Sequence, residues 1–414
     1  MPGLKDKIFY GWIIAVASLI ILTTLLGIRF SFGIFFKSLE VEFLLSRGVT
    51  SVIFSSYMVL YGAFALIAGW ALDRYGPKLV VALMGLATGL SLILTSQTDS
   101  LWQIFLSYSL LLGIGTGGTV PVLMAVVSRW FDRKRGLALG VATAGSGMGT
   151  LVFSPFAAFL ITALEWRIAY LVLGLIGLFV VMSLALVLRG EPGEIGALPD
   201  GIQPDSTVQP IQSEVDLQLI GLSLRESLRT RSLWLLLGAW SLFSLSLSLV
   251  VTHVVPYATD AGISTLEAST ILSVMGGFHI MSRLLVGRVS DTIGRKIPGT
   301  ISALMVTGSL VWLIWSRDLW MFYLFAGFFG FGWGGFGVIN IALVSDCFGR
   351  RGLGVIIGAL EVGFALGVAV GSALGGFTFD ITGNYILAFA IGAACVFTAT
   401  FSLAFIRSEA PRDK

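Results

Sequence analysis

Ionisable side chains lie inside several long apolar stretches of this 414-residue chain. Arg29 lies in the first stretch, His279 and Arg283 share the eighth, and Glu361 lies about nine residues into the eleventh. A charged side chain at membrane depth costs at least roughly 2.5–3.5 kcal/mol and is functional by default. The planar fork of Arg283 can bind both oxygens of a small carboxylate. A buried carboxyl such as Glu361 can be neutral at pH 7, which is what proton coupling requires.

Structural explanations for the same residues stay open. Arg283 can pair permanently with an acid of a neighbouring span, or it can snorkel, since the run 266–287 places it about one turn from the inner edge. Glu361 can form a fixed ion pair with Arg283 or with another cation. Arg29, in the outer half of its run, is either a second cation for the carboxylate or a charge in an entrance funnel.

The chain has two histidines. His279 precedes Arg283 by four residues and so shares its helix face. Imidazole titrates near neutral pH, but the neighbouring guanidinium disfavours its charged form, so both hydrogen bonding and proton transfer stay open. His253 lies in the outer half of the seventh run, where it either reaches a central cavity or sits at the membrane interface.

Aromatic and small polar residues complete a candidate cavity. Tyr57 and Asn340 are candidate substrate-binding residues, although packing is an alternative role for each. The same two possibilities hold for Tyr61, Tyr108, Trp240, Ser244 and Trp333.

The composition requires a membrane to position these groups. The chain is 56% hydrophobic and 12% charged, whereas soluble domains carry about 25% charged residues. At about 20 residues per spanning helix, there is room for roughly a dozen spans. Apolar runs between charged turns predict an all-α protein with spans at 10–36, 49–72, 79–97, 102–128, 137–164, 168–188, 232–258, 266–287, 298–316, 319–345, 353–378 and 384–406.

Lysine and arginine set the orientation. Of the 26, 20 lie in segments on the side of the N-terminus, four lie in the opposite loops, and Arg29 and Arg283 lie inside spans. This asymmetry predicts that both termini are cytoplasmic, in a multi-pass protein of the cell (inner) membrane. The segment 1–10 is too short and polar for a cleavable signal, so the first run is expected to remain.

One long loop divides the spans into six and six. It predicts an N-terminal bundle at 1–189, a cytoplasmic linker at 190–231 and a C-terminal bundle at 232–414. The first part of the linker is rich in proline and acids, as in flexible linkers. Leu217, Ile220, Leu224 and Leu228 lie at helical spacing, which predicts an amphipathic helix over 214–230 on the inner membrane surface.

A charged turn occurs twice, 218 residues apart. The copies read Gly69-Trp-Ala-Leu-Asp73-Arg74-Tyr-Gly76-Pro-Lys78 and Gly287-Arg-Val-Ser-Asp291-Thr-Ile-Gly294-Arg295-Lys296. This repetition predicts two pseudo-symmetric bundles. Each aspartate can accept hydrogen bonds from amides at an adjacent helix start, or pair with a basic residue of the next loop. Asp73, Arg74, Asp291 and Arg295 are therefore candidate gating residues, the alternative being a plain positive-inside loop.

A second motif joins the fourth and fifth spans. It reads Arg129-Trp-Phe131-Asp-Arg133-Lys134-Arg135-Gly136-Leu-Ala-Leu-Gly140-Val-Ala-Thr-Ala-Gly145-Ser-Gly147, with a weaker counterpart from Asp346 to Gly358. Its glycines create a thin helix face for close packing, and Pro155 is expected to kink or weaken the same helix. The functional interpretation is a helix that slides during gating.

The paired charged turns resemble the signature of the major facilitator superfamily. Trp130-Phe131 through Gly145 resembles the loop motif of its monocarboxylate transporter family, and Phe9-Tyr10-Gly11-Trp12 is similar to that family's other signature. The resemblance covers essentially the whole chain and is closest to the bacterial L-lactate transporters. The oxalate/formate exchanger branch shares much of the pattern.

The resemblance implies a fold of twelve transmembrane helices and proton-coupled transport of a small monocarboxylate, L-lactate or pyruvate, by alternating access. In that family an arginine of the eighth span pairs with substrate, a role that falls on Arg283. Animal members carry an aspartate where this chain has His279, and a lysine near Arg29 whose register matches Phe30. Exchangers of dianions carry a lysine in the eleventh span, where this chain has Glu361, which favours a monoanion. Proton-independent exchange of the oxalate/formate type is the alternative.

The remaining expectations are absences. The sequence contains no nucleophile–base constellation and no metal-ligand cluster, so neither an enzyme nor a cofactor is expected. Nucleic acid is not an expected partner, because the basic residues follow topology. The expected partners are the carboxylate, protons and the bilayer, with the monomer as functional unit.

Overall fold

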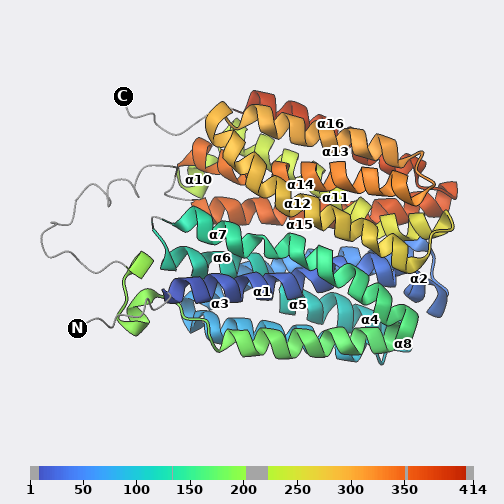
Figure 1. Cartoon of the computed structure of the whole chain (residues 1–414), viewed down its shortest axis with the longest axis horizontal. Helices are drawn as coiled ribbons and strands as arrows, with labels where there is room; N and C mark the ends of the chain where they lie inside the picture. The colour runs from blue at the N-terminus through green and yellow to red at the C-terminus, as the bar shows by residue number, and fades with distance from the viewer. Residues whose placement is uncertain (1–8, 133, 202–221, 350–352, 407–414) are drawn as a thin grey trace, which may run out of the picture.

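The computed structural model describes residues 9–132, 134–201, 222–349 and 353–406. In this part of the chain, ten helical stretches are long and apolar enough to cross a membrane. They run alongside one another in one elongated bundle (Figure 1).

The first half of the chain contains α1 (Tyr10–Phe30), α2 (Phe32–Glu42), α3 (Arg47–Thr95), α4 (Leu101–Ile104), a π-helical segment η1 (Phe105–Leu111), α5 (Leu112–Thr116), α6 (Thr119–Trp130), α7 (Arg135–Thr143) and α8 (Gly145–Ala185). The linker contributes two 3₁₀ turns, Pro192–Ile195 and Pro199–Gly201, and the short α10 (Leu224–Ser227). The second half contains α11 (Arg231–Asp260), α12 (Thr265–Ile293), α13 (Lys296–Leu313), α14 (Leu319–Phe348), α15 (Leu353–Thr382) and α16 (Ile386–Phe405).

These ten stretches make twelve crossings, because two of them fold back. The 49 residues of α3 would extend roughly 74 Å at 1.5 Å per residue, against about 30 Å of hydrocarbon. The chain reverses at Gly76, where φ is 75°. The stretch Arg135–Ala185 likewise reverses at Glu165, where φ is 72°. The expected twelve-helix, six-plus-six architecture is therefore present.

The repeated charged turn has the same backbone geometry in both halves. Gly76 has φ 75° and ψ 166°, and Gly294, its counterpart in the second copy, has φ 86° and ψ 164°. This region of conformational space is essentially restricted to glycine. Pro77 then begins the next helix, a position where its missing N–H is not needed. The sequence repeat is thus a repeated reversal of chain direction.

The two halves lie side by side, with the blue-to-green helices in the lower part of Figure 1 and the yellow-to-red helices above them. The crossings between the halves pair α3 with α15, α8 with α12 and α2 with α11. We call the end where α1 begins and α16 ends the proximal end, on the left of Figure 1, and the opposite end, where α2 lies, the distal end.

Three sequence expectations need correction. α1 continues through α2 to Glu42, so the first crossing is longer than 10–36. α12 extends to Ile293, which places Arg283 ten residues from its end rather than about one turn. α8 runs through Pro155 without a break and deviates at Glu165 instead. Hydropathy does not show that polar residues flanking an apolar run can continue its helix. This explains why the predicted spans 10–36 and 266–287 are too short.

The linker is described in part. Residues 202–221, and with them most of the amphipathic helix expected over 214–230, lie outside the described residues. The described remainder forms only α10, which is capped by Ser223 in a reciprocal capping box with Glu226. The Leu222 amide then donates to the Phe348 carbonyl at 2.8 Å, which attaches this segment to the second half.

Candidate functional site

Arg283 lies in α12 where the two halves meet. Its Nη1 donates to the Thr143 carbonyl, at the C-terminal end of α7 in the other half, over 3.3 Å. A helix C-terminus carries partial negative charge, which favours a cation. Nε of Arg283 is buried without a hydrogen-bond partner, and no acid among the described residues comes within ion-pair distance of this guanidinium. The cation is only partly compensated.

Arg29 is the second cation of this region, and it comes from the first half. Its side chain is 3% exposed, and its Nε has no hydrogen-bond partner among the described residues. The guanidinium carbon lies 4.8 Å from the ring centre of Tyr61 in α3 and 5.6 Å from that of Phe364 in α15. Aromatic faces stabilise a desolvated cation by about 2 kcal/mol. Arg29 is thus held by rings of both halves without a carboxylate.

Glu361 lies in α15, one turn before Phe364, and interacts electrostatically with both Arg29 and Arg283. It forms no ion pair within 4 Å in the described part of the chain. One acid is therefore within electrostatic reach of two cations that come from opposite halves. The sequence left a fixed Arg283–Glu361 pair open as an alternative, and the structure contains no such contact.

His279 and Asn340 lie in the same central region. The His279 ring packs against Trp333 in a tilted arrangement with 4.3 Å between ring centres, and its Nδ1 is buried without a hydrogen-bond partner among the described residues. Asn340 is 2% exposed and its amide nitrogen also lacks a partner among the described residues. Gly337, one turn before Asn340, faces Nη2 of Arg283 at 3.8 Å from its ideal Cβ position. Unpaired polar atoms thus accompany the unpaired charges.

Tyr57 is engaged inside the first half. Its hydroxyl makes a 2.8 Å hydrogen bond with the Thr116 hydroxyl, and its ring packs near Tyr61 and Tyr108. Tyr57 thus lies next to Tyr61, whose ring contacts Arg29. The predicted contact of Tyr57 with substrate stays a prediction.

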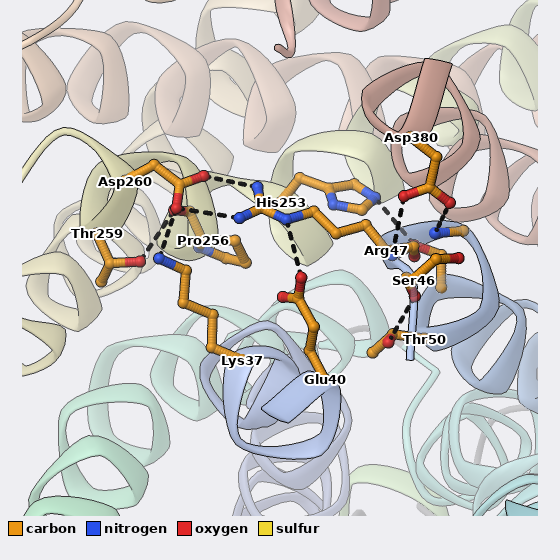
Figure 2. A network of polar contacts seen from close by, with 12 residues as sticks. Lys37, Glu40, Ser46, Arg47, Thr50, His253, Pro256, Thr259, Asp260 and Asp380 are labelled. Atoms are coloured by element: carbon orange, nitrogen blue, oxygen red, sulfur yellow. Dashed lines mark hydrogen bonds and ion pairs between the residues drawn. The ribbon is translucent and has the colours of Figure 1, made fainter. Parts of the chain in front are cut away.

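A charged network joins the halves at the distal end. Asp260, the last residue of α11, accepts a 2.6 Å hydrogen bond from Lys37 of α2. It also receives Nη1 and Nη2 of Arg47 at 2.6 and 3.0 Å, a two-pronged contact across the halves. Glu40 completes the environment of Arg47, with 3.4 Å to its Nε. Figure 2 shows Asp260 between the two cations.

Asp380 of α15 makes a second connection at the same end. Its carboxylate accepts the backbone amides of Arg47 and Gly48, at 3.0 and 2.8 Å, which are the first amides of α3. A carboxylate at a helix N-terminus satisfies free amides and the helix dipole. The Arg47 guanidinium also lies 3.7 Å above the Phe379 ring and donates to the Tyr385 hydroxyl at 2.9 Å. We call these residues (Lys37, Glu40, Arg47, Asp260, Asp380, Tyr385), together with His253 beside them in α11, the distal lock.

His253 belongs to the distal lock rather than to the central region. It is fully buried, two turns before Asp260 in α11, and its Nε2 lies 2.9 Å from the Ser372 carbonyl. The sequence left two locations open for His253, a central cavity and the interface between membrane and water. In the structure His253 instead lies where the two halves of the molecule meet (Figure 2).

The predicted gating residues lie at the proximal end and pair within one half. Asp73 accepts a 2.8 Å hydrogen bond from Nη2 of Arg129, which lies in the last turn of α6. Arg74 is exposed. Nε of Arg295 lies 3.5 Å from Asp346 in α14 of its own half. The side chain of Asp291 lies outside the described part of the chain.

Contact between α3 and α15 ends near the centre. Toward the distal end, Ser55 donates to the Ala369 carbonyl at 2.6 Å, and a Cβ added at Gly62 would lie 2.9 Å from that of Ala365. Beyond this point, a Cβ added at Gly69 or at Gly358 would meet no atom within 4 Å. Glu361 and Arg29 thus lie where these two helices part.

The distal lock was not predicted from sequence. Asp260 and Asp380 each lie two residues beyond a predicted span, 232–258 and 353–378, where a charged residue is typical of an ordinary membrane boundary. A weak signal was present, since Lys37 and Arg47 are two of only four basic residues in the loops on that side.

Comparison with known proteins shows to which family this helical bundle belongs. The model of the Major Facilitator Superfamily matches residues 11–317, about three quarters of the chain. The chain belongs to the Major Facilitator Superfamily. It is therefore a multi-pass membrane transporter and not an enzyme.

The relatives are similar over nearly their whole length. Monocarboxylate transporter 13 of Bos taurus is 26% identical, covering 93% of this chain and 86% of its own. Monocarboxylate transporter 11 of Homo sapiens is 25% identical, covering 95% and 82%. Monocarboxylate transporter 2 of Homo sapiens is 24% identical, covering 91% and 81%.

Among solved structures, a bacterial homolog of the human lysosomal transporter Spinster, in an inward-facing and unoccupied conformation, superposes with a TM-score of 0.72 at 15% identity. It covers 98% of this chain and 95% of its own. At that identity the likeness concerns the fold.

Proposed function

We propose that this chain transports small monocarboxylates, L-lactate or pyruvate in particular, together with a proton. The observation that carries the proposal is Arg283, a cation between the two halves whose described partner is a backbone carbonyl and not an acid. A carboxylate would supply the missing charge and the second hydrogen bond. The names of the relatives agree with this substrate class.

Charge balance favours one monoanion with one proton. With Glu361 ionised, the empty site carries two cations and one anion, a net charge of one. A bound monoanion together with a proton on Glu361 leaves that net charge unchanged. Empty and loaded carriers then face the same electrostatic cost of crossing, which a carrier that returns empty requires. His279 is the other candidate for the proton, and Arg29 is the second cation for the substrate.

We propose alternating access because the two ends of the α3–α15 interface differ. The distal lock joins the halves, while a Cβ added at Gly69 or at Gly358, near the proximal end, would meet no atom within 4 Å. We assign the protein to the inner membrane of the cell, with the proximal end and both termini on the cytoplasmic side. This orientation follows because lysine and arginine concentrate at the proximal end. In this assignment the structure corresponds to a state closed to the outside.

The two bundles that move are proposed to be 1–189 and 232–414, connected by the linker 190–231, with the monomer as the transporting unit. Asp73, Arg74, Asp291 and Arg295 are proposed to hold the proximal end when it closes. The described ion pairs of Asp73 with Arg129 and of Arg295 with Asp346 would orient two of these four residues for that state.

The test is uptake of labelled L-lactate into proteoliposomes, with and without an inward proton gradient. Arg283→Ala should lower uptake by about tenfold to a hundredfold, since a hydrogen bond to a charged group contributes about 1.5–3 kcal/mol. Arg283→Lys should recover only part of it, because an ammonium lacks the planar fork. Arg288→Ala, an exposed arginine of the same helix, is the matched control.

Two outcomes would contradict the proposal. Unchanged uptake by Arg283→Ala would remove the anchor. Strong counterflow at symmetric pH without any response to a proton gradient would replace symport by anion exchange.

A further inference from the structure

The distal lock contains a buried histidine whose hydrogen bonds define its tautomer. His253 Nε2 lies 2.9 Å from the Ser372 carbonyl of α15. A carbonyl oxygen only accepts, so Nε2 must carry a hydrogen. In the neutral ring Nδ1 is then a bare acceptor, and it is buried with no partner among the described residues.

The pocket around His253 is formed by both halves and is tightly packed. Phe36 of α2 and Tyr385 each lie 5.2 Å from the imidazole centre. A Cβ at Gly375 of α15 would lie 2.3 Å from the ring. The Ser51 hydroxyl of α3 lies 3.5 Å from Nε2 and donates to the Arg47 carbonyl.

The charged and titratable groups facing this pocket are already engaged with one another. They come from every element packed against it and comprise Lys37 and Glu40 of α2, Arg47 of α3, Asp260 of α11, Asp380 of α15 and Tyr385. Asp260 receives Arg47 and Lys37, and Asp380 receives the first amides of α3. Neither carboxylate is hydrogen bonded to the imidazole in the described structure.

Protonation would therefore place a new N–H donor at Nδ1, which is buried with no acceptor among the described residues. A buried charge without a partner is strongly disfavoured. Separation of the halves would let water or a carboxylate of the lock reach Nδ1. A state that binds a proton more readily becomes more populated as pH falls, by linkage.

We propose that His253 is a proton-binding site that opens the distal end when it is occupied. The site is distinct from the central Glu361, and it responds without substrate. It acts as a sensor of the solution at the distal end: the proton that opens the lock must leave His253 before the lock closes again. That this solution is the cell exterior rests on the orientation given in the proposed function.

The experiment measures the separation of the halves in substrate-free protein. Spin labels at Val41 and Ile381, which are 74% and 84% exposed at the distal end of opposite halves, report the distance by pulsed electron paramagnetic resonance. The two free cysteines of the chain, Cys347 and Cys395, are replaced by alanine beforehand so that they take up no spin label. From about pH 8 to about pH 5.5, the window in which imidazole titrates, the ratio of long to short distances should rise by up to about tenfold per pH unit.

Three variants make the result specific. His253→Gln, whose amide can still donate to the Ser372 carbonyl, should keep the short distance at every pH. His279→Gln, which removes the other histidine, should respond like the parent. Asp260→Asn should give long distances already at about pH 8, which verifies that the labels detect opening.

A pH-independent distance in the parent would overturn the proposal, and so would a His253→Gln response equal to the parent's. If the glutamine variant does not fold, His253→Asn is judged by the same criterion. Because no substrate is present, a failure of this inference is separate from a failure of lactate uptake.

Discussion

At the scale of single residues, the two sites differ in whether their charged side chains form ion pairs. The distal lock pairs its charges closely, with Asp260 holding both Arg47 and Lys37. The central site leaves Arg29, Arg283 and Glu361 without ion pairs among the described residues. Paired charges fix a conformation, whereas unpaired charges can bind a ligand. This contrast supports a lock at one place and a binding site at the other.

Replacing Glu361 by glutamine separates proton coupling from substrate binding. The side chain keeps its size but cannot take up or release a proton, so lactate accumulation driven by a proton gradient should fall at least about tenfold. Exchange of labelled for unlabelled lactate at equal pH should persist, because it requires no net proton movement. Both are measured in proteoliposomes, with Glu191→Gln in the linker, an exposed acid, as control. Retention of gradient-driven accumulation would move the proton to another group.

At the scale of elements, glycine determines how closely the halves approach. At the crossing of α8 and α12, a Cβ on Gly276 would lie 2.6 Å from the Gly147 carbonyl, and one on Gly147 would lie 2.5 Å from Ile280. Small residues permit such backbone contact in membranes. This crossing lies one turn from His279 and two turns from Arg283, so helix spacing and site geometry are linked.

Substituting the two adjacent glycines of α12 tests this link. Gly276→Ala forces the helices apart or strains them, which costs about 1–3 kcal/mol, and should lower both thermal stability and uptake. Gly277→Ala meets nothing within 4 Å and should be neutral or stabilising by up to about 1 kcal/mol, from helix propensity. Thermal unfolding in detergent and lactate uptake provide the two readouts. Equal effects of the two substitutions would show that spacing at this crossing is unimportant.

At the scale of the whole molecule, the halves are joined at the distal end and part near Glu361. The central charges lie at this branching point, two on one half and Arg29 on the other. Movement of the halves therefore changes the separation of Arg29 from Glu361 and Arg283. In the proposed cycle, that change is what makes substrate and proton binding depend on conformation.

The proposed stoichiometry predicts transport that is independent of membrane potential. One anion carried with one proton moves no net charge. Transfer of one net charge would instead contribute about 2.3 kcal/mol per 100 mV, roughly a fiftyfold change in accumulation. Lactate uptake at fixed pH gradient should be equal when a potassium–valinomycin potential of either sign is imposed. Acceleration by either polarity would require a different ratio of protons to anions.

Much of the architecture was predictable because the bilayer imposes a simple rule. Apolar runs must cross it as helices, so the twelve crossings follow from hydropathy, and the repeated turn predicts the two halves. The ends of crossings were predicted less well: α12 extends past 287 to Ile293. Polar residues continue a helix by backbone hydrogen bonds that hydropathy does not report.

The identity of the central charged residues also follows from the chain alone, since an arginine or glutamate in an apolar run is conspicuous wherever it lies. Their partners do not follow, because partnership depends on distances between helices far apart in sequence. Arg283 meets the Thr143 carbonyl 140 residues away, and Arg47 meets Asp260 213 residues away. Local physics thus specifies which helices form and what they carry, while the packing of the halves decides that His253 joins the lock and that Glu361 comes within electrostatic reach of two cations.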